Sequence, residues 1–176
     1  MFTNPNNNQQ HKYFMDLALS QAKKVLGNTK ENPPVGCVIT KNGNVVSVGH
    51  TSINGRPHAE RNAINFSKIK VDNGNLYTTL EPCDHFGKTP PCTNFIISKK
   101  IKKVFFSISD PDVRSFNKCI KKFKKKNIKV IKGILKSKVN NFYKSYIKFK
   151  NIRVPFVTLK IAISKDFFTI NKKEKW

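Results

Sequence analysis

Apolar segments of two periodicities alternate along this 176-residue chain, and this alternation constrains its fold most strongly. Apolar residues recur at helical spacing over 10–26, whereas 35–40 and 44–49 have the composition of strands. The Asn42-Gly43 pair between those two strands is a strong signal for a β-hairpin. Because strands that alternate with helices pack in layers, the sequence predicts an α/β fold.

The remaining elements continue the same alternation. Residues 1–10 are rich in Asn and Gln and are predicted to form a disordered tail. No apolar run is long enough for a membrane span, and the N-terminus lacks the apolar stretch of a secretory signal, so we expect a soluble cytoplasmic protein. Helices are predicted at 58–69, 92–99, 116–126 and 136–149, and strands at 75–80, 103–109, 129–131 and 154–163.

The formal charge of +24 raises the question of a nucleic-acid partner. No acidic residue lies between Asp112 and Asp166, and six lysines cluster within 118–126. However, only 4 of the 34 basic residues are Arg, the residue that specific nucleic-acid sites favour for its bidentate fork. The enriched Lys, Asn, Ile and Phe share A/T-rich codons, so we attribute the charge to codon bias and do not expect a nucleic-acid partner.

Four cysteines are present, and without a secretory signal they favour a metal or catalytic role over disulfides. Cys37 lies within an apolar strand and is predicted to be a small buried hydrophobe. Cys119 lies on a Lys-rich helix and is interpreted as incidental. Cys83 and Cys92 both follow prolines in a loop dense in Pro, Gly, Asp and His, which is typical of a functional loop.

Three motifs converge on a catalytic zinc site. His58-Ala59-Glu60 begins a predicted helix, Glu81-Pro82-Cys83 follows a strand, and Pro90-Pro91-Cys92 begins the next helix. One imidazole and two thiolates supply three Zn²⁺ ligands and leave a fourth position for water. Zinc deaminases have the layout H-x-E followed by P-C-x-x-C, in which the Glu is the general acid/base, and the order of the motifs here matches it. We therefore predict His58, Cys83 and Cys92 as zinc ligands and Glu60 as the catalytic residue.

Beyond these motifs, the chain resembles the deaminase domain of the bifunctional riboflavin-biosynthesis enzymes, which combine a diaminohydroxyphosphoribosylaminopyrimidine deaminase with a 5-amino-6-(5-phosphoribosylamino)uracil reductase. The resemblance covers about 12–164. Eight residues separate Cys83 from Cys92, where other zinc deaminases have two, and this long insert is the specific feature. The matching stretches are 32–38, 55–60, 77–92, 110–112 and 154–160.

The resemblance implies a three-layer α/β/α cytidine deaminase-like fold with a central mixed sheet of about five strands, and a deaminase domain at 11–150. It also implies hydrolytic deamination of 2,5-diamino-6-(5-phosphoribosylamino)pyrimidin-4(3H)-one to 5-amino-6-(5-phosphoribosylamino)uracil and ammonia, with one catalytic zinc ion. A phosphorylated pyrimidine is then the small-molecule partner. By the same resemblance, the substrate pocket is lined by Asn32, His50, His85, Lys88, Asp110 and Asp112.

The chain departs from this family at its C-terminal end. Residues 154–164 resemble the beginning of the reductase domain, but Ser164-Lys165-Asp166-Phe167 lacks the glycine that normally follows. We therefore expect residues 151–176 to represent the start of a truncated or absent reductase domain, and NADPH not to be a cofactor. A homodimer and a separate reductase partner both remain open.

Two alternatives also remain open at this point. One is a zinc deaminase of another nucleobase, nucleotide or tRNA, which the charge favours and the long insert opposes. The other is a degenerate ligand-binding domain without activity, which the altered segment 113–118 favours and the intact zinc motifs oppose.

Overall fold

The computed structural model describes residues 5–169, and a five-stranded mixed sheet forms its centre. The strands lie in the order β2-β1-β3-β4-β5. β1 pairs antiparallel with β2 and β3, whereas β3, β4 and β5 are parallel to one another. Their bounds are β1 (Gly36–Lys41), β2 (Asn44–His50), β3 (Asn75–Leu80), β4 (Lys103–Ile108) and β5 (Lys129–Lys132).

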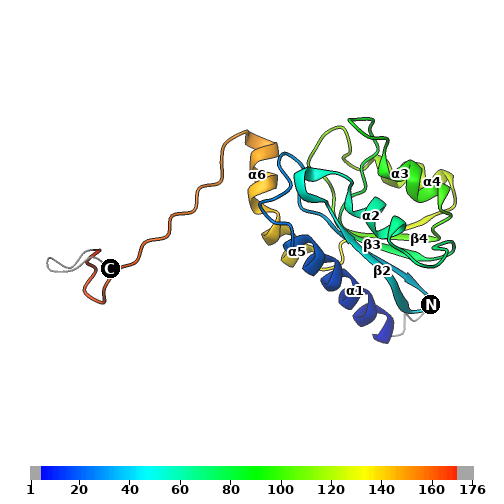
Figure 1. Cartoon of the computed structure of the whole chain (residues 1–176), viewed down its shortest axis with the longest axis horizontal. Helices are drawn as coiled ribbons and strands as arrows, with labels where there is room; N and C mark the ends of the chain where they lie inside the picture. The colour runs from blue at the N-terminus through cyan, green and yellow to red at the C-terminus, as the bar shows by residue number, and fades with distance from the viewer. Residues whose placement is uncertain (1–4, 170–176) are drawn as a thin grey trace.

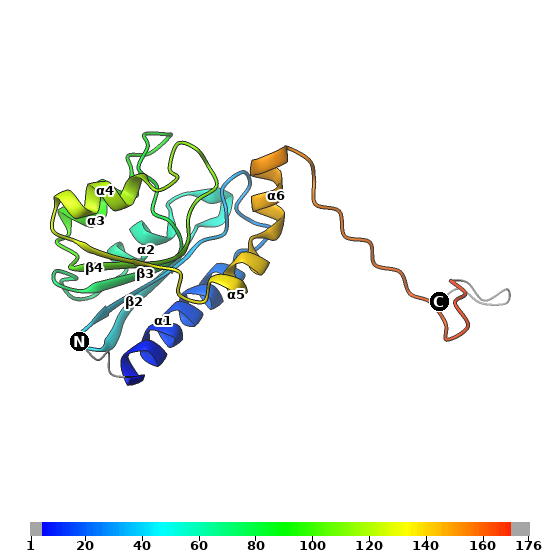
Figure 2. The ribbon, with the colours of Figure 1, turned by 180° about the vertical axis from the view of Figure 1, so that it is seen from behind.

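Helices cover both faces of this sheet, so the predicted three-layer α/β/α fold is confirmed (Figures 1 and 2). α1 (Pro5–Lys23) and α5 (Lys136–Phe142) lie on one face, with α6 (Lys144–Ile152) continuing at its edge. On the other face lie α2 (Ala59–Asn65), α3 (Cys92–Ser98) and α4 (Lys118–Lys125), and a short 3-10 turn, η1 (Ile53–Gly55), precedes α2.

Alternate side chains of the strands fill two apolar layers, as the pleat of a sheet requires. On the α1 face, Phe14 and Met15 pack with Tyr77 of β3 and Phe105 of β4. On the opposite face, residues of α2, α3 and α4 pack against the other side of the same strands: Ala59, Ala63, Ile96, Phe123, Ile39, Leu76, Val104 and Phe106. Both faces of the sheet are therefore buried, so a site that is open to substrate is expected at the ends of the strands.

Close approach of α1 to the sheet depends on a glycine in β1. A Cβ atom on Gly36 would collide with the backbone oxygen of Ala18 and lie 2.6 Å from the backbone nitrogen of Ala22. Any side chain at this position would therefore displace α1 from the sheet.

The loops that contain the predicted motifs meet at one end of the strands, which we call the sheet edge. The carboxyl ends of β2, β3 and β4 and the amino end of β1 all lie at this edge, because β1 runs opposite to its neighbours. The segments that leave it are 51–58, 81–92 and 109–117, and they contain all three predicted motifs or their flanks. Ligands of open α/β sheets bind outside the carboxyl ends of strands, which is where these loops converge.

Several predicted elements differ from the structure. The strand predicted at 154–163 was wrong, because those residues pair with no strand of the described chain and have no regular structure. Residues 5–10, expected within a disordered tail, form the first turns of α1, while 1–4 lie outside the described residues. The single helix predicted at 136–149 is divided at Tyr143 into α5 and α6, and the helix predicted at 58–69 ends at Asn65.

The segment after α6 extends away from the layered domain (Figure 2). Val157 and Leu159 are 79% and 78% exposed, so its apolar residues do not join the core. Among the described residues, no helix combines the length and the hydropathy needed to cross a bilayer.

Candidate zinc and substrate site

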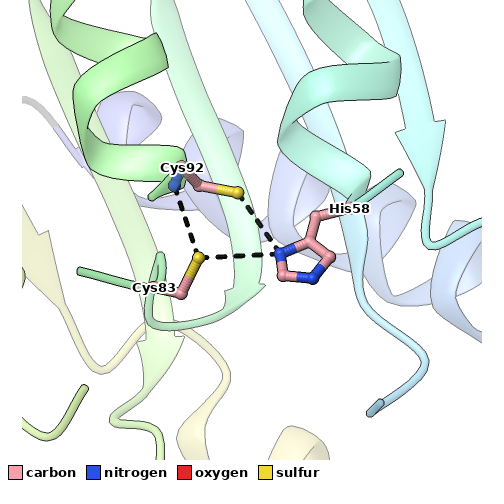
Figure 3. A group of neighbouring side chains, drawn as sticks. All are labelled: His58, Cys83 and Cys92. Carbon is pink, nitrogen blue, oxygen red and sulfur yellow. Dashed lines mark hydrogen bonds between the residues drawn. The ribbon is translucent and has the colours of Figure 1, made fainter. Parts of the chain in front are cut away.

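Three metal-ligating side chains meet at the sheet edge, each placed by the end of a regular element (Figure 3). His58 immediately precedes α2, Cys83 lies in the loop after β3, and Cys92 is the first residue of α3. The Nδ1 atom of His58 lies 3.6 Å from the Sγ of Cys83 and 3.4 Å from the Sγ of Cys92. All three ligand atoms lie within 4.8 Å of one another.

These residues fit a tetrahedral zinc ion. Ordinary Zn–N and Zn–S bond lengths put a nitrogen and a sulfur ligand roughly 3.5 Å apart in a tetrahedron. The two observed N···S distances agree with that separation. Imidazole and thiolate are the ligands that zinc prefers, and a set of three leaves one position open, as catalytic zinc sites do. The expectation of one zinc ion is confirmed by this donor set and by the family comparison below.

The surroundings favour a thiolate at Cys83. Hydrogen bonds from Cys92 and His58 lower the pKa of Cys83 to about 4, against the opposing effect of burial. The Cys83 contact and the negative charge of Glu60 in turn raise the pKa of His58, although burial acts in the opposite direction. The pKa of Cys92 is raised because Cys83 holds the shared negative charge and because Cys92 is buried. A second thiolate at Cys92 therefore needs a cation beside it, which a metal ion would supply.

Glu60 lies beside the triad and is only 4% exposed. Burial raises the pKa of its carboxyl group to about 7. On a regular helix, a residue two positions after His58 would point about 200° away from it. His58, however, lies just before the helix with an extended backbone (φ −71°, ψ 159°), whereas Glu60 lies in its first turn. The regular helical spacing therefore does not apply to this pair, and both side chains line the same cavity.

The cavity beside the triad has a volume of about 320 Å³. Five of the six residues expected to bind substrate line it: Asn32, His85, Lys88, Asp110 and Asp112. They come from the loop before β1, the long insert between Cys83 and Cys92, and the loop after β4. The structure thus brings together residues that are up to 80 positions apart.

Two of these residues are held by hydrogen bonds to neighbouring loops. The Nδ2 of Asn32 donates to the carbonyl oxygen of Gly55 at 2.9 Å. The Nδ1 of His85 lies 2.9 Å from the Oγ of Ser115 and links the insert to the loop after β4. Burial and the positive charge of Arg114 lower the pKa of His85.

His50 is placed differently from the other five. It ends β2 and is not among the residues that line the cavity. Its carbonyl oxygen accepts a hydrogen bond from the Nδ2 of Asn62 at 2.7 Å. The contact that this structure shows for His50 is therefore between β2 and α2.

The pKa values of the two aspartates after β4 are shifted in opposite directions. Asp110 is 7% exposed, and burial raises its pKa to about 6. Its Oδ1 accepts hydrogen bonds from the Tyr146 hydroxyl and the Asp112 N–H, both at 3.0 Å. Asp112 pairs with Arg114 and Lys150, which hold the pKa of its carboxyl group well below the usual range.

The sequence interpretation assigned no role to several other side chains that line the cavity, among them Arg56, Glu81, Arg114, Tyr146 and Lys150. Arg56 lies between Gly55 and Pro57, and its Nη1 donates to the Oγ1 of Thr89 at 2.8 Å. Its place two residues before His58 was a signal that could have identified it. Tyr146 and Lys150 belong to α6, where no local motif marks them, and only the fold brings them to the cavity.

The other two cysteines take no part in the site. Cys37 and Cys119 are both fully buried, and burial raises the pKa of each thiol well above its usual range. The interpretation of Cys37 as a small buried hydrophobe agrees with this burial, and Cys119, interpreted as incidental, is buried in the same way.

Comparison with known proteins places these motifs in a family context. The family model described as the cytidine and deoxycytidylate deaminase zinc-binding region matches residues 8–108. The chain is 38% identical to the riboflavin biosynthesis protein RibD of Aquifex aeolicus over 167 residues. It is 37% identical to RibD of Bacillus amyloliquefaciens over 166 residues. These alignments cover 94% and 93% of this chain but 47% and 45% of the relatives, so the chain spans less than half of their length.

A solved structure shows the same architecture. The Thermotoga maritima diaminohydroxyphosphoribosylaminopyrimidine deaminase/5-amino-6-(5-phosphoribosylamino)uracil reductase is 40% identical and superposes with a TM-score of 0.86. The superposition covers 91% of this chain and 46% of that protein. The cytidine deaminase-like fold is therefore confirmed, as is the resemblance to riboflavin-pathway deaminase domains.

Proposed function

Because the chain belongs to the cytidine and deoxycytidylate deaminase zinc-binding family, we propose that it is a zinc-dependent hydrolase that deaminates 2,5-diamino-6-(5-phosphoribosylamino)pyrimidin-4(3H)-one. The products are 5-amino-6-(5-phosphoribosylamino)uracil and ammonia. The observation that carries this proposal is the meeting of His58, Cys83 and Cys92 beside the buried Glu60 at one cavity.

His58, Cys83 and Cys92 would hold the zinc ion. When bound there, zinc supplies Lewis acidity that makes water nucleophilic near neutral pH. Glu60 accepts the proton of the attacking water on its carboxylate and returns it to the leaving amine. Its position on the first turn of α2 directs this carboxylate toward the cavity that His58 also lines.

The cavity supplies the chemistry for a polar pyrimidine. Its volume of about 320 Å³ lies at the lower end of the usual range for small-molecule pockets. Asn32, His85 and Asp110 offer donors and acceptors for the ring, and Lys88 offers a cation for an anionic group. All the lining residues lie within 31–150, which supports our assignment of the deaminase to residues 11–150.

The relatives support the proposed substrate class. The Thermotoga maritima protein is described as a deaminase and a reductase, and this chain matches 46% of it. The long insert between Cys83 and Cys92 supports the same substrate over cytidine or tRNA adenosine, because it contributes His85 and Lys88 to the cavity. These two residues would be absent from a site with two residues between the cysteines.

Ammonia release tests this proposal directly. Zinc-loaded protein is incubated separately with the diaminopyrimidine ribotide, cytidine, dCMP and an adenosine-containing tRNA. The proposal expects multiple turnovers with the ribotide and none with the other three. Turnover of cytidine, dCMP or tRNA without turnover of the ribotide would contradict the assigned substrate. No turnover of any substrate by fully zinc-loaded protein would favour a ligand-binding domain instead.

A further inference from the structure

Asp112 holds two cationic side chains that come from different parts of the chain. Its carboxylate receives two hydrogen bonds from Arg114, from Nε at 2.9 Å and from Nη2 at 2.7 Å. The Nζ of Lys150, from α6, lies 3.0 Å from Oδ2 of the same carboxylate. A bidentate contact fixes the plane of the guanidinium group, so the position of Arg114 is defined by Asp112.

This cluster retains positive charge and free donors. Arg114 and Lys150 carry two positive charges and the Asp112 carboxylate carries one negative charge, so these three side chains have a net charge of about +1. Asp110, whose Oδ1 accepts a hydrogen bond from the Asp112 N–H, is a further carboxyl group beside them. Arg114 has five N–H donors and uses two on the Asp112 side chain, and Lys150 has three and uses one there. The remaining donors can bind an anion while the carboxylate stays in place.

The cluster belongs to the same cavity as the zinc ligands. Asp112, Arg114 and Lys150 all line that cavity together with His58 and Cys83. The side chains of Asp112 and Lys150 are 11% and 18% exposed, whereas that of Arg114 is 60% exposed, so the cluster lies where the cavity opens to solvent. Of the zinc ligands, Cys92 is buried and His58 and Cys83 are partly buried, whereas Arg114 is exposed, so Arg114 lies at the solvent end of the cavity.

The position of the cluster relative to the triad is fixed through His85. The backbone N–H of Ser115 donates to the carbonyl oxygen of Asp112 at 2.8 Å, and the Ser115 hydroxyl contacts His85. His85 lies two residues after Cys83, so the turn at 112–115 is tied to the zinc-binding loop. The distance between the reacting carbon and an anion at the outer end would thereby be set by the fold.

We propose that Arg114 and Lys150 form an anion subsite that binds the phosphate of the substrate, and that Asp112 is a positioning residue that holds both cations. This inference rests on the proposed function for the identity of the phosphorylated substrate. Asp112 then acts through its two partners and not by contact with the pyrimidine or ribose. Arg114 is 60% exposed, and an ion pair with an exposed partner contributes little to stability, so recognition is the role that the Asp112–Arg114 pair supports.

A comparison of two substrates separates recognition of phosphate from catalysis. The ratio of kcat/KM for the diaminopyrimidine ribotide to kcat/KM for the same compound without phosphate is measured with the full zinc-loaded chain. We expect this ratio to fall about tenfold to hundredfold in Arg114→Gln, Lys150→Gln and Asp112→Asn, mainly through KM of the ribotide. Lys150→Arg should keep most of the ratio. Lys148→Gln, an exposed lysine on the same helix that does not line the cavity, is the matched control.

Binding of ribose 5-phosphate, measured by calorimetry, provides a readout that does not need turnover. The wild-type protein and Lys148→Gln should bind it, and Arg114→Gln, Lys150→Gln and Asp112→Asn should bind at least about tenfold more weakly. Unchanged binding in these three variants would overturn the inference, as would an equal loss of kcat/KM on both substrates in Asp112→Asn. If the wild-type protein turns over neither substrate, the proposed function fails, and ribose 5-phosphate binding still decides whether the anion subsite exists.

Discussion

The backbone N–H of Cys92 donates a hydrogen bond to the Sγ of Cys83 at 3.3 Å. This contact joins the loop after β3 to the first turn of α3 across the eight-residue insert. It holds one thiolate in place through the backbone, and the same turn carries the second ligand. The two cysteines are separated by eight residues in the sequence, but their sulfur atoms lie together with the His58 nitrogen and form one ligand set.

Loss of either cysteine should remove the metal. Cys83→Ser and Cys92→Ser should bind zinc at much less than one ion per chain, because a neutral hydroxyl is a poor replacement for a thiolate. Zinc content after dialysis against a weak chelator, measured by atomic emission, checks this. Cys119→Ala is the control, since Cys119 is a buried residue of α4 outside the triad, and it should keep one zinc per chain. Equal zinc content in all three variants would show that the triad is not the metal site.

Asp110 should make stability fall as the pH rises. Its pKa is about 6 in the folded protein and about 3.9 in an unfolded chain, so the folded state holds the proton more tightly. The stabilising effect is complete below about pH 4 and is lost as the pH rises through about 6. The unfolding free energy of the wild type relative to Asp110→Asn should therefore decrease by about 2–3 kcal/mol between pH 4 and 7.

Urea unfolding at pH 4, 5, 6 and 7 measures this difference. Asp112→Asn is the matched comparison, because its ion pairs with Arg114 and Lys150 lower the pKa of Asp112. Asp112 should contribute nearly constant stability between about pH 5 and 7, because a carboxyl group with a lowered pKa loses its stabilising effect only as the pH falls below about 4. A pH-independent difference between the wild type and Asp110→Asn would mean that Asp110 titrates as it does in an unfolded chain.

Gly36→Ala should destabilise the domain by about 1–3 kcal/mol, since its Cβ would enter the backbone of α1 at Ala18. Urea unfolding provides the comparison with Gly87→Ala, where the nearest atom to a Cβ lies 3.9 Å away. The change at Gly87 should stay within about 0.5 kcal/mol. If both substitutions had the same small effect, α1 would not pack against β1 as closely as described.

The zinc triad could be predicted from the sequence because each ligand lies in a short local motif that specifies its chemistry. His58 and Glu60 lie two positions apart in one motif, and both cysteines follow prolines at element boundaries. Tyr146 and Lys150 could not be predicted in this way, because no local motif marks them and only the fold brings these residues of α6 to the cavity. Arg114 lies in the altered segment 113–118, and its role depends on a side-chain contact with Asp112 that the sequence does not specify.

The parts of the fold that could be predicted are likewise those that local sequence specifies. The Asn42-Gly43 turn and the apolar periodicity specify β1 and β2 locally, and both strands match the structure. The strand predicted at 154–163 has strong β-forming residues, but a strand also needs a partner, and residue composition does not supply one. Residues 5–10 were judged by their polar composition, yet they continue a helix whose apolar face is fixed by Phe14 and Met15.

Turnover by Glu60→Gln tests the central claim most directly. The ammonia released from the diaminopyrimidine ribotide is measured for the wild type and for Glu60→Gln at equal zinc content. The account predicts that kcat falls at least about hundredfold while the variant keeps one zinc ion per chain, because the amide retains the shape of the carboxyl group but cannot accept the proton. A zinc-loaded Glu60→Gln variant that turned over at the wild-type rate would contradict the account.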